Sequence, residues 1–337
     1  MQRMLHNVIA LHTAPKTISI IDRDLAHPQQ GYVCVRYDYC AICGGDHSVY
    51  LGRRNAYPYT LGHEFVATVI DVGKDVQQIQ KNDIVVSDFN FRCGNCEFCR
   101  HGKSHLCIEN GKEHFSNRGF ALYGNIHESY LLKISPPEYL PRACLIEPLS
   151  CVLHACAQMK LNRESRVLLC GCGSIGTLFC FYLTRILQCA SVTVKETNQH
   201  KLFEVCKHFP IYPFQNQGNN CFDYIIDCSN STDGVYFSLS VATPGSNVCI
   251  MSHLYGLDTS FIYEEICQKE LVCIFPLRNG QKENLSLALK YIQQYWTTFD
   301  DDLLQIYDDI YTAFSHKTID FHSKQIVRLS SLASKLE

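Results

Sequence analysis

The 337-residue chain has no excess of charge of either sign. Its 30 Lys and Arg residues face 33 Asp and Glu residues, which gives a formal net charge of −3. Proteins whose main partner is nucleic acid or an acidic membrane surface usually carry a strongly basic balance. The composition therefore argues against both of these partners.

The sequence also lacks an export signal and internal repeats. Residues 1–8 have no apolar stretch of the kind found in signal peptides, so we expect a cytoplasmic protein whose 20 cysteines are mostly reduced. The one stretch that resembles a membrane span, residues 167–189, contains three glycines and Arg185. It reads better as a buried strand followed by a helix. The length predicts about two domains.

Four cysteines stand close together in the pattern C-x2-C-x2-C-x7-C, namely Cys93, Cys96, Cys99 and Cys107. Each two-residue gap allows a tight turn, so the first three sulfurs can converge and the fourth returns after a short excursion. Four thiolates around one centre are typical of a structural zinc site, which has no open position and performs no chemistry.

Two alternatives remain for these cysteines. Thiolates also suit an iron–sulfur cluster, although the plant-type spacing has a longer first gap and the bacterial run a shorter last gap. Unligated or disulfide-bonded cysteines are the other alternative. The even spacing of three cysteines followed by a fourth favours zinc.

Periodicity divides the chain into a β-rich first part and an alternating second part. In the first 135 residues, strands are expected at 7–12, 17–22, 31–42, 65–72, 83–87 and 129–134. Further strands are expected at 166–170, 191–195, 222–227, 246–251 and 271–275, and helices at 174–188, 199–208 and 283–295. This predicts an α/β fold with a parallel doubly wound sheet. The short segment between His208 and Phe222 predicts a trimmed sheet edge.

A glycine-rich turn follows the expected strand 166–170 and opens the next helix. The segment Gly171-Cys172-Gly173-Ser174-Ile175-Gly176 has the G-x-G-x-x-G pattern of dinucleotide-binding proteins. In such a turn the first glycine makes the bend, the second admits a pyrophosphate and the third lets helix and strand pack closely. The helix N-terminus then faces the phosphates. An ordinary strand–helix turn is the alternative.

Glu196 lies 20 residues after Gly176, at the end of the second expected strand of this series. A carboxylate there accepts hydrogen bonds from a ribose diol and repels a 2′-phosphate, which favours NAD over NADP. Lys195 and Lys201 lie nearby, so NADP stays possible.

Three short segments carry side chains that bind metals. Cys43 stands in residues 41–47, and His63 and Glu64 follow in residues 61–65, whereas Glu147 opens a later helix. Three such ligands and one open position define a catalytic zinc site. Taken singly, each residue has a plainer explanation: packing for a buried Cys or His, and a helix N-terminal charge for Glu147.

In their order along the chain, these motifs resemble those of the zinc-containing medium-chain dehydrogenases. The resemblance covers nearly the whole sequence, and Gly62-His63-Glu64 with Glu147-Pro148-Leu149-Ser150 is most similar to the polyol branch. Sorbitol, threonine and ribitol-5-phosphate dehydrogenases belong to that branch. The resemblance implies a GroES-like catalytic domain over 1–150 and 286–337, a Rossmann domain over 151–285 and an active site in the cleft between them.

The resemblance also implies roles for single residues. A catalytic zinc ion would be held by Cys43, His63 and Glu64, with Glu147 as a fourth ligand or as a partner of a water on the metal. The cysteine loop would bind a second, structural zinc ion. Asp46 would orient His63, as carboxylates commonly do for metal-bound imidazoles.

Cofactor contacts are implied in the second domain. The candidates are Gly171, Gly173, Ser174, Ile175, Gly176, Glu196, Lys201 and Arg278. The placement of Arg278 would let it meet the cofactor or the substrate.

One position departs from the family pattern. Relatives usually have Ser or Thr two residues after the catalytic Cys, and that hydroxyl passes the substrate proton outward, but this chain has Gly45. His47, Ser48 or water would replace it. His47 is the nearest titratable candidate, because its ordinary pKa suits proton transfer near neutrality.

Together these residues predict an enzyme with two zinc ions per chain that transfers a hydride between a secondary alcohol and NAD. Zinc would act as a Lewis acid on the alcohol, whose carbon gives hydride to the nicotinamide. The expected substrate is a small-molecule polyol, a sugar alcohol or its phosphate, and the expected assembly is a homodimer or homotetramer. An amino-alcohol or cyclitol is the alternative substrate.

Two alternatives to this enzyme were weighed. A zinc-free alkene reductase of the same superfamily would lack both the Cys/His/Glu set and the cysteine loop. A descendant that binds the cofactor without turnover is favoured only by Gly45.

Overall fold

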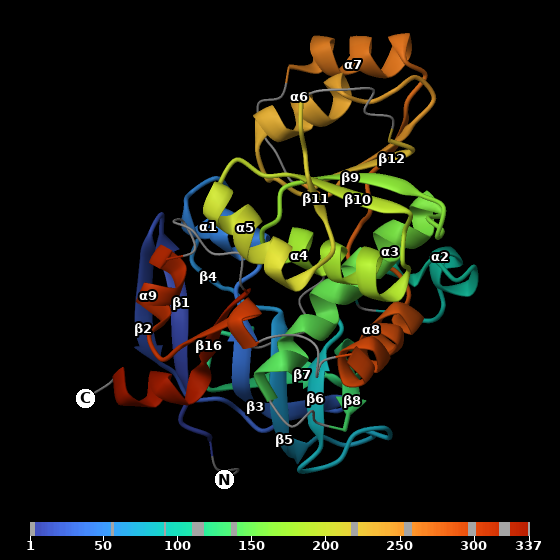
Figure 1. The fold of residues 1–337 in the computed structure, drawn as a ribbon. Helices are drawn as coiled ribbons and strands as arrows, with labels where there is room; N and C mark the ends of the chain where they lie inside the picture. The colour runs from blue at the N-terminus through green and yellow to red at the C-terminus, as the bar shows by residue number, and fades with distance from the viewer. Residues whose placement is uncertain are drawn as a thin grey trace. The chain divides into compact units, whose positions relative to one another are not determined.

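The computed structural model describes residues 4–54, 57–90, 92–109, 118–135, 140–216, 222–252, 258–295, 301–316 and 324–335. They form two compact units, whose elements are labelled in Figure 1. The described residues of the first unit come from Met1–Ser150, Asn279–Ile319 and Lys324–Glu337, and those of the second from Cys151–Arg278.

The first unit contains two sheets. The larger has the strand order β15-β16-β3-β5-β6-β8, and β7 also pairs with β3. Its strands are β3 (Tyr32–Ala41), β5 (Glu64–Val72), β6 (Ile84–Ser87), β7 (Tyr123–His127), β8 (Leu131–Ile134), β15 (Leu304–Tyr307) and β16 (Lys324–Arg328). The smaller sheet has the order β2-β1-β4, with β1 (Val8–Ala14), β2 (Thr17–Asp22) and β4 (Tyr59–Thr60).

Short helices connect these strands. They are α1 (Gly44–Tyr50), α2 (Glu97–Arg100), α8 (Lys282–Tyr295) and α9 (Ile310–His316), with 3-10 turns η1 (Ser104–Leu106), η2 (Glu128–Tyr130), η3 (Leu140–Leu145), η6 (Asp301–Leu303) and η7 (Leu329–Lys335). The longest strand, β3, buries Val33, Val35 and Tyr37, and the Tyr37 ring packs edge-on against Phe65 of β5 at 4.9 Å. Burial of these apolar side chains holds the sheet together.

The second unit is a six-stranded sheet with the order β11-β10-β9-β12-β13-β14, and every pair in it is parallel. Its strands are β9 (Arg166–Cys170), β10 (Ser191–Lys195), β11 (Tyr212–Pro213), β12 (Tyr224–Asp227), β13 (Asn247–Ile250) and β14 (Val272–Ile274). Numbered along the chain, the order is 3-2-1-4-5-6, which is that of the Rossmann fold. The predicted fold class is therefore confirmed, and the edge strand β11 is only two residues long, as the short 208–222 segment predicted.

The helices of the second unit are more numerous than the sequence predicted. They are α4 (Ser174–Phe181), which continues as the π-helical turn η4 (Tyr182–Ile186), α5 (Gln199–His208), α6 (Thr232–Ser240) and α7 (Thr259–Gln268). Helix α3 (Ile146–Met159) leads from the first unit into the second. Helices α6 and α7, which lie side by side in Figure 1, were not expected.

Three further observations differ from the sequence-based expectations. Strands β4, β7, β15 and β16 were not predicted. The second unit was expected to extend to residue 285 but ends at Arg278, because the buried Asn279 side chain bonds to Asp88 and Asn90 of the first unit. The segment Leu140–Met159, rather than 167–189, is long and apolar enough to cross a membrane by length and composition, and 78% of it is buried in the structure.

Candidate functional site

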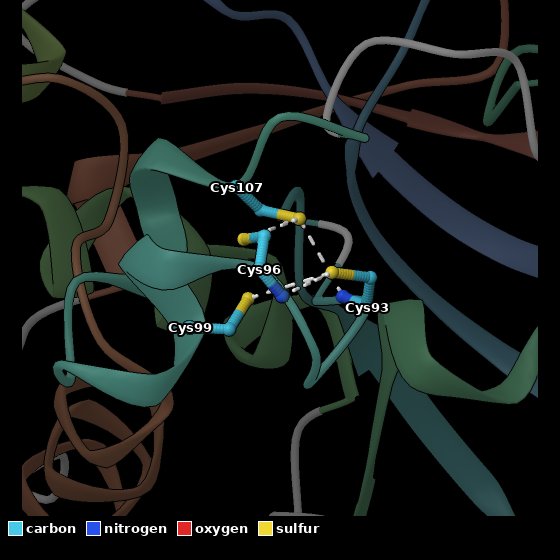
Figure 2. Close-up of side chains that lie close together, drawn as sticks. All are labelled: Cys93, Cys96, Cys99 and Cys107. Carbon is cyan, nitrogen blue, oxygen red and sulfur yellow. Dashed lines mark hydrogen bonds between the residues drawn. The ribbon is translucent and has the colours of Figure 1, made fainter.

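The four cysteines of the loop converge on one point (Figure 2). Their sulfurs lie within 4.8 Å of one another, with 4.0 Å between Cys93 and Cys99 and 3.9 Å between Cys96 and Cys107. A tetrahedral zinc site with Zn–S bonds of about 2.3 Å places its sulfurs about 3.8 Å apart. A disulfide would need about 2.05 Å. The spacing fits one ion and excludes disulfides between these residues.

Hydrogen bonds from backbone amides lower the pKa of two of these thiols, which favours the thiolate form that binds a metal. Hydrogen bonds from the backbone N–H groups of Cys99 and Ile108 lower the pKa of Cys96 to about 6. The N–H groups of Cys96 and Asn95 likewise lower the pKa of Cys93. Burial instead raises the pKa of Cys99 to about 12. A bound cation would offset that penalty, because it stabilises the thiolate directly.

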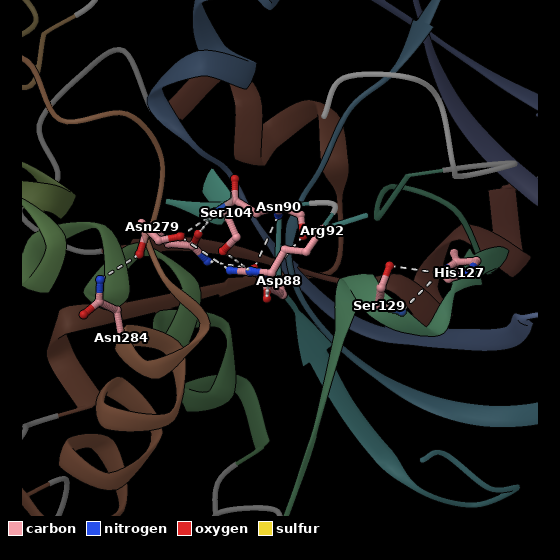
Figure 3. Close-up of polar contacts among 9 residues, drawn as sticks. Asp88, Asn90, Arg92, Ser104, His127, Ser129, Asn279 and Asn284 are labelled. Carbon is pink, nitrogen blue, oxygen red and sulfur yellow. Dashed lines mark hydrogen bonds and ion pairs between the residues drawn. The ribbon is translucent and has the colours of Figure 1, made fainter. Parts of the chain in front are cut away.

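A buried polar network fastens both ends of the cysteine loop (Figure 3). Arg92, next to Cys93 in the sequence, donates to Asp88 and, over 2.9 Å, to Ser104 Oγ. Asn279 Nδ2 donates to Asp88 Oδ1 over 3.1 Å, and Asn90 donates to Asn279. Asp88, Asn90 and Asn279 are fully buried. The network ties the loop to the start of the C-terminal segment of the same unit.

The second candidate metal site brings together Cys43, His63 and Glu64. One ligand atom from each lies within 4.8 Å of the others. Sulfur, imidazole nitrogen and carboxylate oxygen form a donor set that zinc accepts, and bonds of about 2.0–2.3 Å would require the set to contract by at most about 1 Å. The residues present therefore fit the ion that the sequence implies.

Local structure places Cys43 at the N-cap of α1. Its Sγ accepts from Gly45 N over 3.4 Å, and Asp46 Oδ2 accepts from Cys43 N over 3.2 Å. The positive end of the helix dipole favours an ionised thiol here. Asp46 Oδ1 lies 3.7 Å from His63 Nδ1 and accepts from Gly62 N over 3.4 Å. One buried carboxylate thus contacts the backbone of one candidate ligand and the side chain of another.

The structure adds Lys324, which sequence reasoning missed. Its Nζ lies 2.7 Å from Glu64 Oε1 and 2.5 Å from Oε2, and the two side chains are 3% and 1% exposed. Burial lowers the pKa of Lys324, but the nearby Glu64, Cys43 and Glu147 more than offset that effect and the pKa is raised. The ammonium therefore supplies a positive charge in the middle of the candidate ligands. No local motif marks it, since 260 positions separate it from Glu64.

Glu147 lies in the same region but outside the set of three. It is 5% exposed near the start of α3 and close enough to Lys324 to raise its pKa. It does not belong to the group whose ligand atoms lie within 4.8 Å of one another. In this arrangement Glu147 is a neighbour of the Cys43, His63 and Glu64 group.

The residues around the missing family hydroxyl lie on α1. A Cβ on Gly45 would have Cys43 Sγ as its nearest neighbour, at 3.9 Å, so a side chain fits there. Ser48 Oγ donates to Gly44 O over 3.0 Å, and the His47 ring stacks on Tyr50 with 6.0 Å between centroids. The relay assigned to His47 stays a prediction.

Aromatic rings line one flank of His63. The Phe89 ring stacks on the imidazole with 4.3 Å between centroids and an interplanar angle of 30°. The Arg118 guanidinium lies over Phe89 at 5.3 Å and over Tyr59 at 4.7 Å. Neither Phe89 nor Arg118 was identified from the sequence, because nothing in the surrounding residues connects them to the metal-ligand motifs.

In the second unit the glycine turn has the expected geometry. Gly171 has a φ of 94°, which disfavours other residues, and a Cβ on Gly176 would lie 2.1 Å from Gly171 O. A Cβ on Gly173 would meet nothing within 4 Å, so open space lies beside the backbone at the start of α4. Ser174 and Ile175 form the first turn of this helix and are partly exposed.

The Glu196 side chain is hydrogen-bonded to the same turn. Its Oε2 accepts from Cys172 N over 3.0 Å, and its Oε1 accepts from Asn198 N over 2.9 Å. Burial raises the pKa of Glu196, but hydrogen bonds from these amides and the charge of Lys201 outweigh it, so the pKa is lowered. The assignment of Glu196 to a ribose diol stays a prediction.

The two basic cofactor candidates occupy different places. Lys201 lies in the first turn of α5, where its backbone N–H donates to the Asn198 side chain over 3.0 Å. Arg278 adopts a φ of 57° at the last position of the second unit. The positive charge of Lys201 helps to lower the pKa of Glu196.

Part of this chain matches a known family and curated proteins. Residues 29–136 match the model of the alcohol dehydrogenase GroES-like domain. D-arabinitol dehydrogenase 1 of Uromyces fabae is 31% identical over 169 residues, which cover 49% of this chain and 47% of that protein. S-(hydroxymethyl)glutathione dehydrogenase of Escherichia coli strain SMS-3-5 / SECEC is 28% identical over 225 residues, covering 58% and 59%. The chain thus spans about half the length of these curated relatives.

Solved structures share the fold over the whole chain. A short chain alcohol dehydrogenase of E. coli CFT073 complexed with NADH has a TM-score of 0.82 at 22% identity, with coverage of 96% and 99%. Galactitol-1-phosphate dehydrogenase from Escherichia coli has a TM-score of 0.80 at 18% identity, with coverage of 96% and 100%. The resemblance found in the sequence is confirmed at the level of the fold: residues 29–136 match the alcohol dehydrogenase GroES-like domain, and the chain shares the fold of these solved dehydrogenases.

Proposed function

We propose that this protein is a zinc-dependent dehydrogenase that oxidises a secondary alcohol with NAD and catalyses the reverse reduction. The observation that carries the proposal is the convergence of Cys43, His63 and Glu64, which come from two separate segments, on one point. A purely structural metal site does not require three different types of donor atom, nor ligands that are partly exposed to solvent. The closed cysteine site would supply stability rather than chemistry.

Each residue of the site has a task in this proposal. Cys43, His63 and Glu64 would hold the zinc ion, which when bound polarises the alcohol oxygen and favours its deprotonation. The contact between Asp46 and His63 Nδ1 leaves Nε2 as the ring nitrogen for the metal. Asp46 would also keep the first turn of α1, and with it the Cys43 sulfur, in place through the capping hydrogen bond.

Lys324 balances the charge of the ligand set. An ionised Cys43 and Glu64 carry two negative charges, which neutralise a divalent ion and weaken its effect on the alcohol. The buried ammonium within 2.7 Å of Glu64 draws part of that negative charge to itself. If Glu64 kept its ion pair with Lys324 instead of binding the metal, Glu147, which also interacts with this lysine, would take its place as a ligand.

The second unit would bind the cofactor. The open space beside Gly173 and the N-terminus of α4 suit a pyrophosphate, and Glu196 would accept hydrogen bonds from the ribose diol. Ser174 and Ile175 would contribute backbone contacts, and Lys201 and Arg278 remain candidates at the edge of this site. We infer a preference for NAD, with NADP as the alternative because Lys195 and Lys201 lie close to Glu196.

The substrate is proposed to be a polyol, a sugar alcohol or its phosphate. Two similar proteins carry names that fit, namely D-arabinitol dehydrogenase 1 and galactitol-1-phosphate dehydrogenase. S-(hydroxymethyl)glutathione dehydrogenase among the relatives keeps other alcohols as alternatives. A homodimer or homotetramer and a cytoplasmic location complete the proposal.

A screen for turnover tests the activity. Zinc-loaded protein is incubated with NAD and a panel of sugar alcohols, their phosphates, cyclitols and amino-alcohols, and NADH formation is followed by absorbance. We expect turnover of at least one polyol and its loss in Cys43→Ser. Tight NADH binding by calorimetry without turnover of any alcohol would replace the proposal with a cofactor-binding, non-enzymatic role.

The cofactor assignment has its own test. Glu196→Ala should weaken the use of NAD and admit NADP, because the carboxylate no longer repels the 2′-phosphate. Glu204→Ala is the matched control, since it removes a carboxylate from the same helix region without touching the turn. A wild-type enzyme that prefers NADP would show that Lys195 or Lys201 determines the choice.

His47 is tested separately as the proton acceptor. His47→Ala should lower the oxidation rate by about 100-fold near neutral pH, the low end for general acid–base catalysis, without loss of zinc. An unchanged pH–rate profile would leave water as the acceptor.

A further inference from the structure

Arg118 lies beside the candidate catalytic metal site although 54 positions separate it from Glu64 in the sequence. Two backbone hydrogen bonds fix its neighbours against the segment that carries His63: Gly119 N donates to Gly62 O over 3.0 Å, and Phe120 N donates to Leu61 O over 3.1 Å. All of these residues belong to the first unit. The position of Arg118 next to the site is therefore determined by backbone pairing.

The guanidinium packs against two aromatic rings. Its central carbon lies 4.7 Å from the Tyr59 ring centroid and 5.3 Å from that of Phe89. Stacking engages the flat faces of a guanidinium, whereas its five N–H donors point outward in the plane. A guanidinium held in this way is oriented in advance for a carboxylate or phosphate, which it binds with two parallel hydrogen bonds.

The stack continues to the metal ligand. Phe89 packs on His63 at 4.3 Å, so the Arg118 carbon lies at most 4.3 plus 5.3 Å, that is 9.6 Å, from the His63 ring centroid. An extended covalent chain advances by about 1.2 Å per bond. An alcohol with up to roughly eight bonds between its hydroxyl and an anionic group would therefore be long enough to span the two groups.

Arg118 also differs from the other cation of the site in its accessibility. Lys324 is 3% exposed and in contact with both carboxylate oxygens of Glu64. Arg118, Phe89 and His63 are each partly exposed, so their stack borders solvent. The site otherwise contains the acidic groups Asp46, Glu64 and Glu147, which would repel an anionic substrate. A cation at its accessible flank would compensate for that repulsion.

We propose that Arg118 is a specificity-determining residue that binds an anionic group of the alcohol substrate, at the end away from the reacting hydroxyl. The group is a phosphate monoester or a carboxylate, which share the geometry that a guanidinium recognises. This inference rests on the proposed dehydrogenase function and narrows its substrate class to acidic alcohols. It assigns Tyr59 and Phe89 the task of orienting the guanidinium.

The test compares three alcohols with similar carbon chains: sorbitol, sorbitol 6-phosphate and gluconate. For the zinc-loaded wild-type enzyme we expect kcat/KM to be at least about tenfold higher for one of the two anions than for sorbitol, as expected of a charge-assisted hydrogen bond. Arg118→Gln should lower kcat/KM for that anion by about 10- to 100-fold, mainly through KM. Its effect on sorbitol should stay within about twofold. The anion whose kcat/KM falls further in Arg118→Gln shows whether Arg118 recognises a phosphate or a carboxylate.

Two control variants separate recognition from structure. Arg118→Lys keeps the charge but loses the planar fork, so it should retain only part of the preference. Arg23→Gln removes an exposed arginine of the same unit and should leave all three substrates unchanged. Zinc content and the melting temperature of each variant report whether the site is intact.

Binding without turnover distinguishes failure of this inference from failure of the proposed function. Sorbitol 6-phosphate and gluconate are titrated calorimetrically into zinc-loaded wild type, Arg118→Lys and Arg118→Gln. Binding that Arg118→Gln weakens at least tenfold supports the inference even if no alcohol is oxidised, in which case only the dehydrogenase proposal fails. Equal binding and turnover of anions and sorbitol in wild type, or an anion preference that survives in both Arg118 variants, would overturn it. If Arg118→Gln fails to fold, Arg118→Lys and the wild-type preference decide the question.

Discussion

The two candidate metal sites of the first unit are built in opposite ways. The cysteine site takes its four ligands from 15 consecutive residues, 93–107. The Cys43–His63–Glu64 site takes its ligands from two segments, and its countercharge, Lys324, lies 260 positions from Glu64. The first site depends on the spacing within one loop, whereas the second depends on the fold around it.

The two sites also differ in what they need from a metal. The four sulfurs lie close to one another, and bringing four thiolates together requires a cation. In the second site the carboxylate of Glu64 already has a cationic partner in Lys324. We therefore expect the cysteine loop to depend on zinc for its structure and the second site to stay folded without it.

The largest expected effect is that of Cys99→Ser. Loss of one of four thiolates opens the closed site, and structural zinc sites contribute about 10–16 kcal/mol of apparent binding energy in small domains. We expect a loss of about 5 kcal/mol or more in unfolding free energy and a fall in zinc content from about two ions to about one per chain. Urea unfolding and elemental analysis measure both. A soluble, fully active Cys99→Ser protein would contradict the structural role.

Cys43→Ser should have the reverse pattern. The serine hydroxyl preserves the N-cap of α1, so stability should change by less than about 1 kcal/mol. Activity should fall by about 1,000-fold, because the Lewis acid contributes several kcal/mol to the transition state. Zinc should again fall from about two ions to about one per chain. If zinc analysis gives about one ion for the wild type and the same value for Cys43→Ser, the second site is not a metal site.

Lys324→Met tests the internal countercharge. Without its partner, Glu64 is a buried uncompensated charge, and breaking such a pair costs about 3–5 kcal/mol. We expect this loss in zinc-free protein and a smaller one in zinc-loaded protein, since the ion then provides the positive charge. Lys324→Met combined with Glu64→Gln should recover most of the stability. Equal losses with and without zinc would show that Glu64 does not contact the metal.

Lowering the pH should reduce the stability of the folded protein around the second site, because His12 becomes protonated. This buried ring packs against Tyr50 of α1 and Phe314, and burial lowers its pKa to about 4. Because the folded-state pKa lies below the unfolded value of about 6.5, the neutral ring contributes stability above pH 6.5. That contribution, at most about 3 kcal/mol, is lost as the pH falls from 6.5 toward 4.

The measurement compares urea unfolding of wild type and His12→Leu at pH 7 and pH 4.5. The variant should lose less stability than the wild type between these values. His6→Leu, at a 62% exposed histidine, is the control and should follow the wild type. Parallel losses in all three proteins would remove His12 from this account.

The smallest effect is expected for Gly45→Ser. The position has room for a side chain, with 3.9 Å from an ideal Cβ to the nearest atom, so folding should be unaffected. A hydroxyl here would provide the proton path that family members have, and we expect the oxidation rate to rise by up to about tenfold. Stopped-flow measurement of the first turnover checks this. A slower enzyme with unchanged zinc content would show that the chain uses another path.

Some features of the protein follow from the sequence alone. The four-cysteine loop and the glycine turn depend on residues that are close neighbours in the chain, so their spacing already determines their geometry. The alternation of strands and helices between residues 166 and 208 matched the structure almost residue for residue, because strong apolar runs and a glycine turn delimit each element.

Other elements were missed because their local preferences oppose their structure. Strand β7 contains Gly124 and Asn125, which disfavour strands, and it forms through its pairing with β3. Helix α6 contains Gly234, a poor helix former. A larger residue would not fit at this position, because its Cβ would lie 2.0 Å from Ser229 Oγ. Packing against neighbouring segments overrides propensity at both places.

Tertiary structure alone decided the environment of the candidate catalytic site. The sequence identified Cys43, His63, Glu64 and Glu147 through a family resemblance, but it could not tell which carboxylate lies within the ligand set. Lys324 reaches Glu64 because β16 pairs with β3, and Arg118 lies near the segment that carries His63 because residues 119–120 bond to residues 61–62. Such contacts leave no trace in local spacing, since they depend on backbone pairing between segments far apart in the chain.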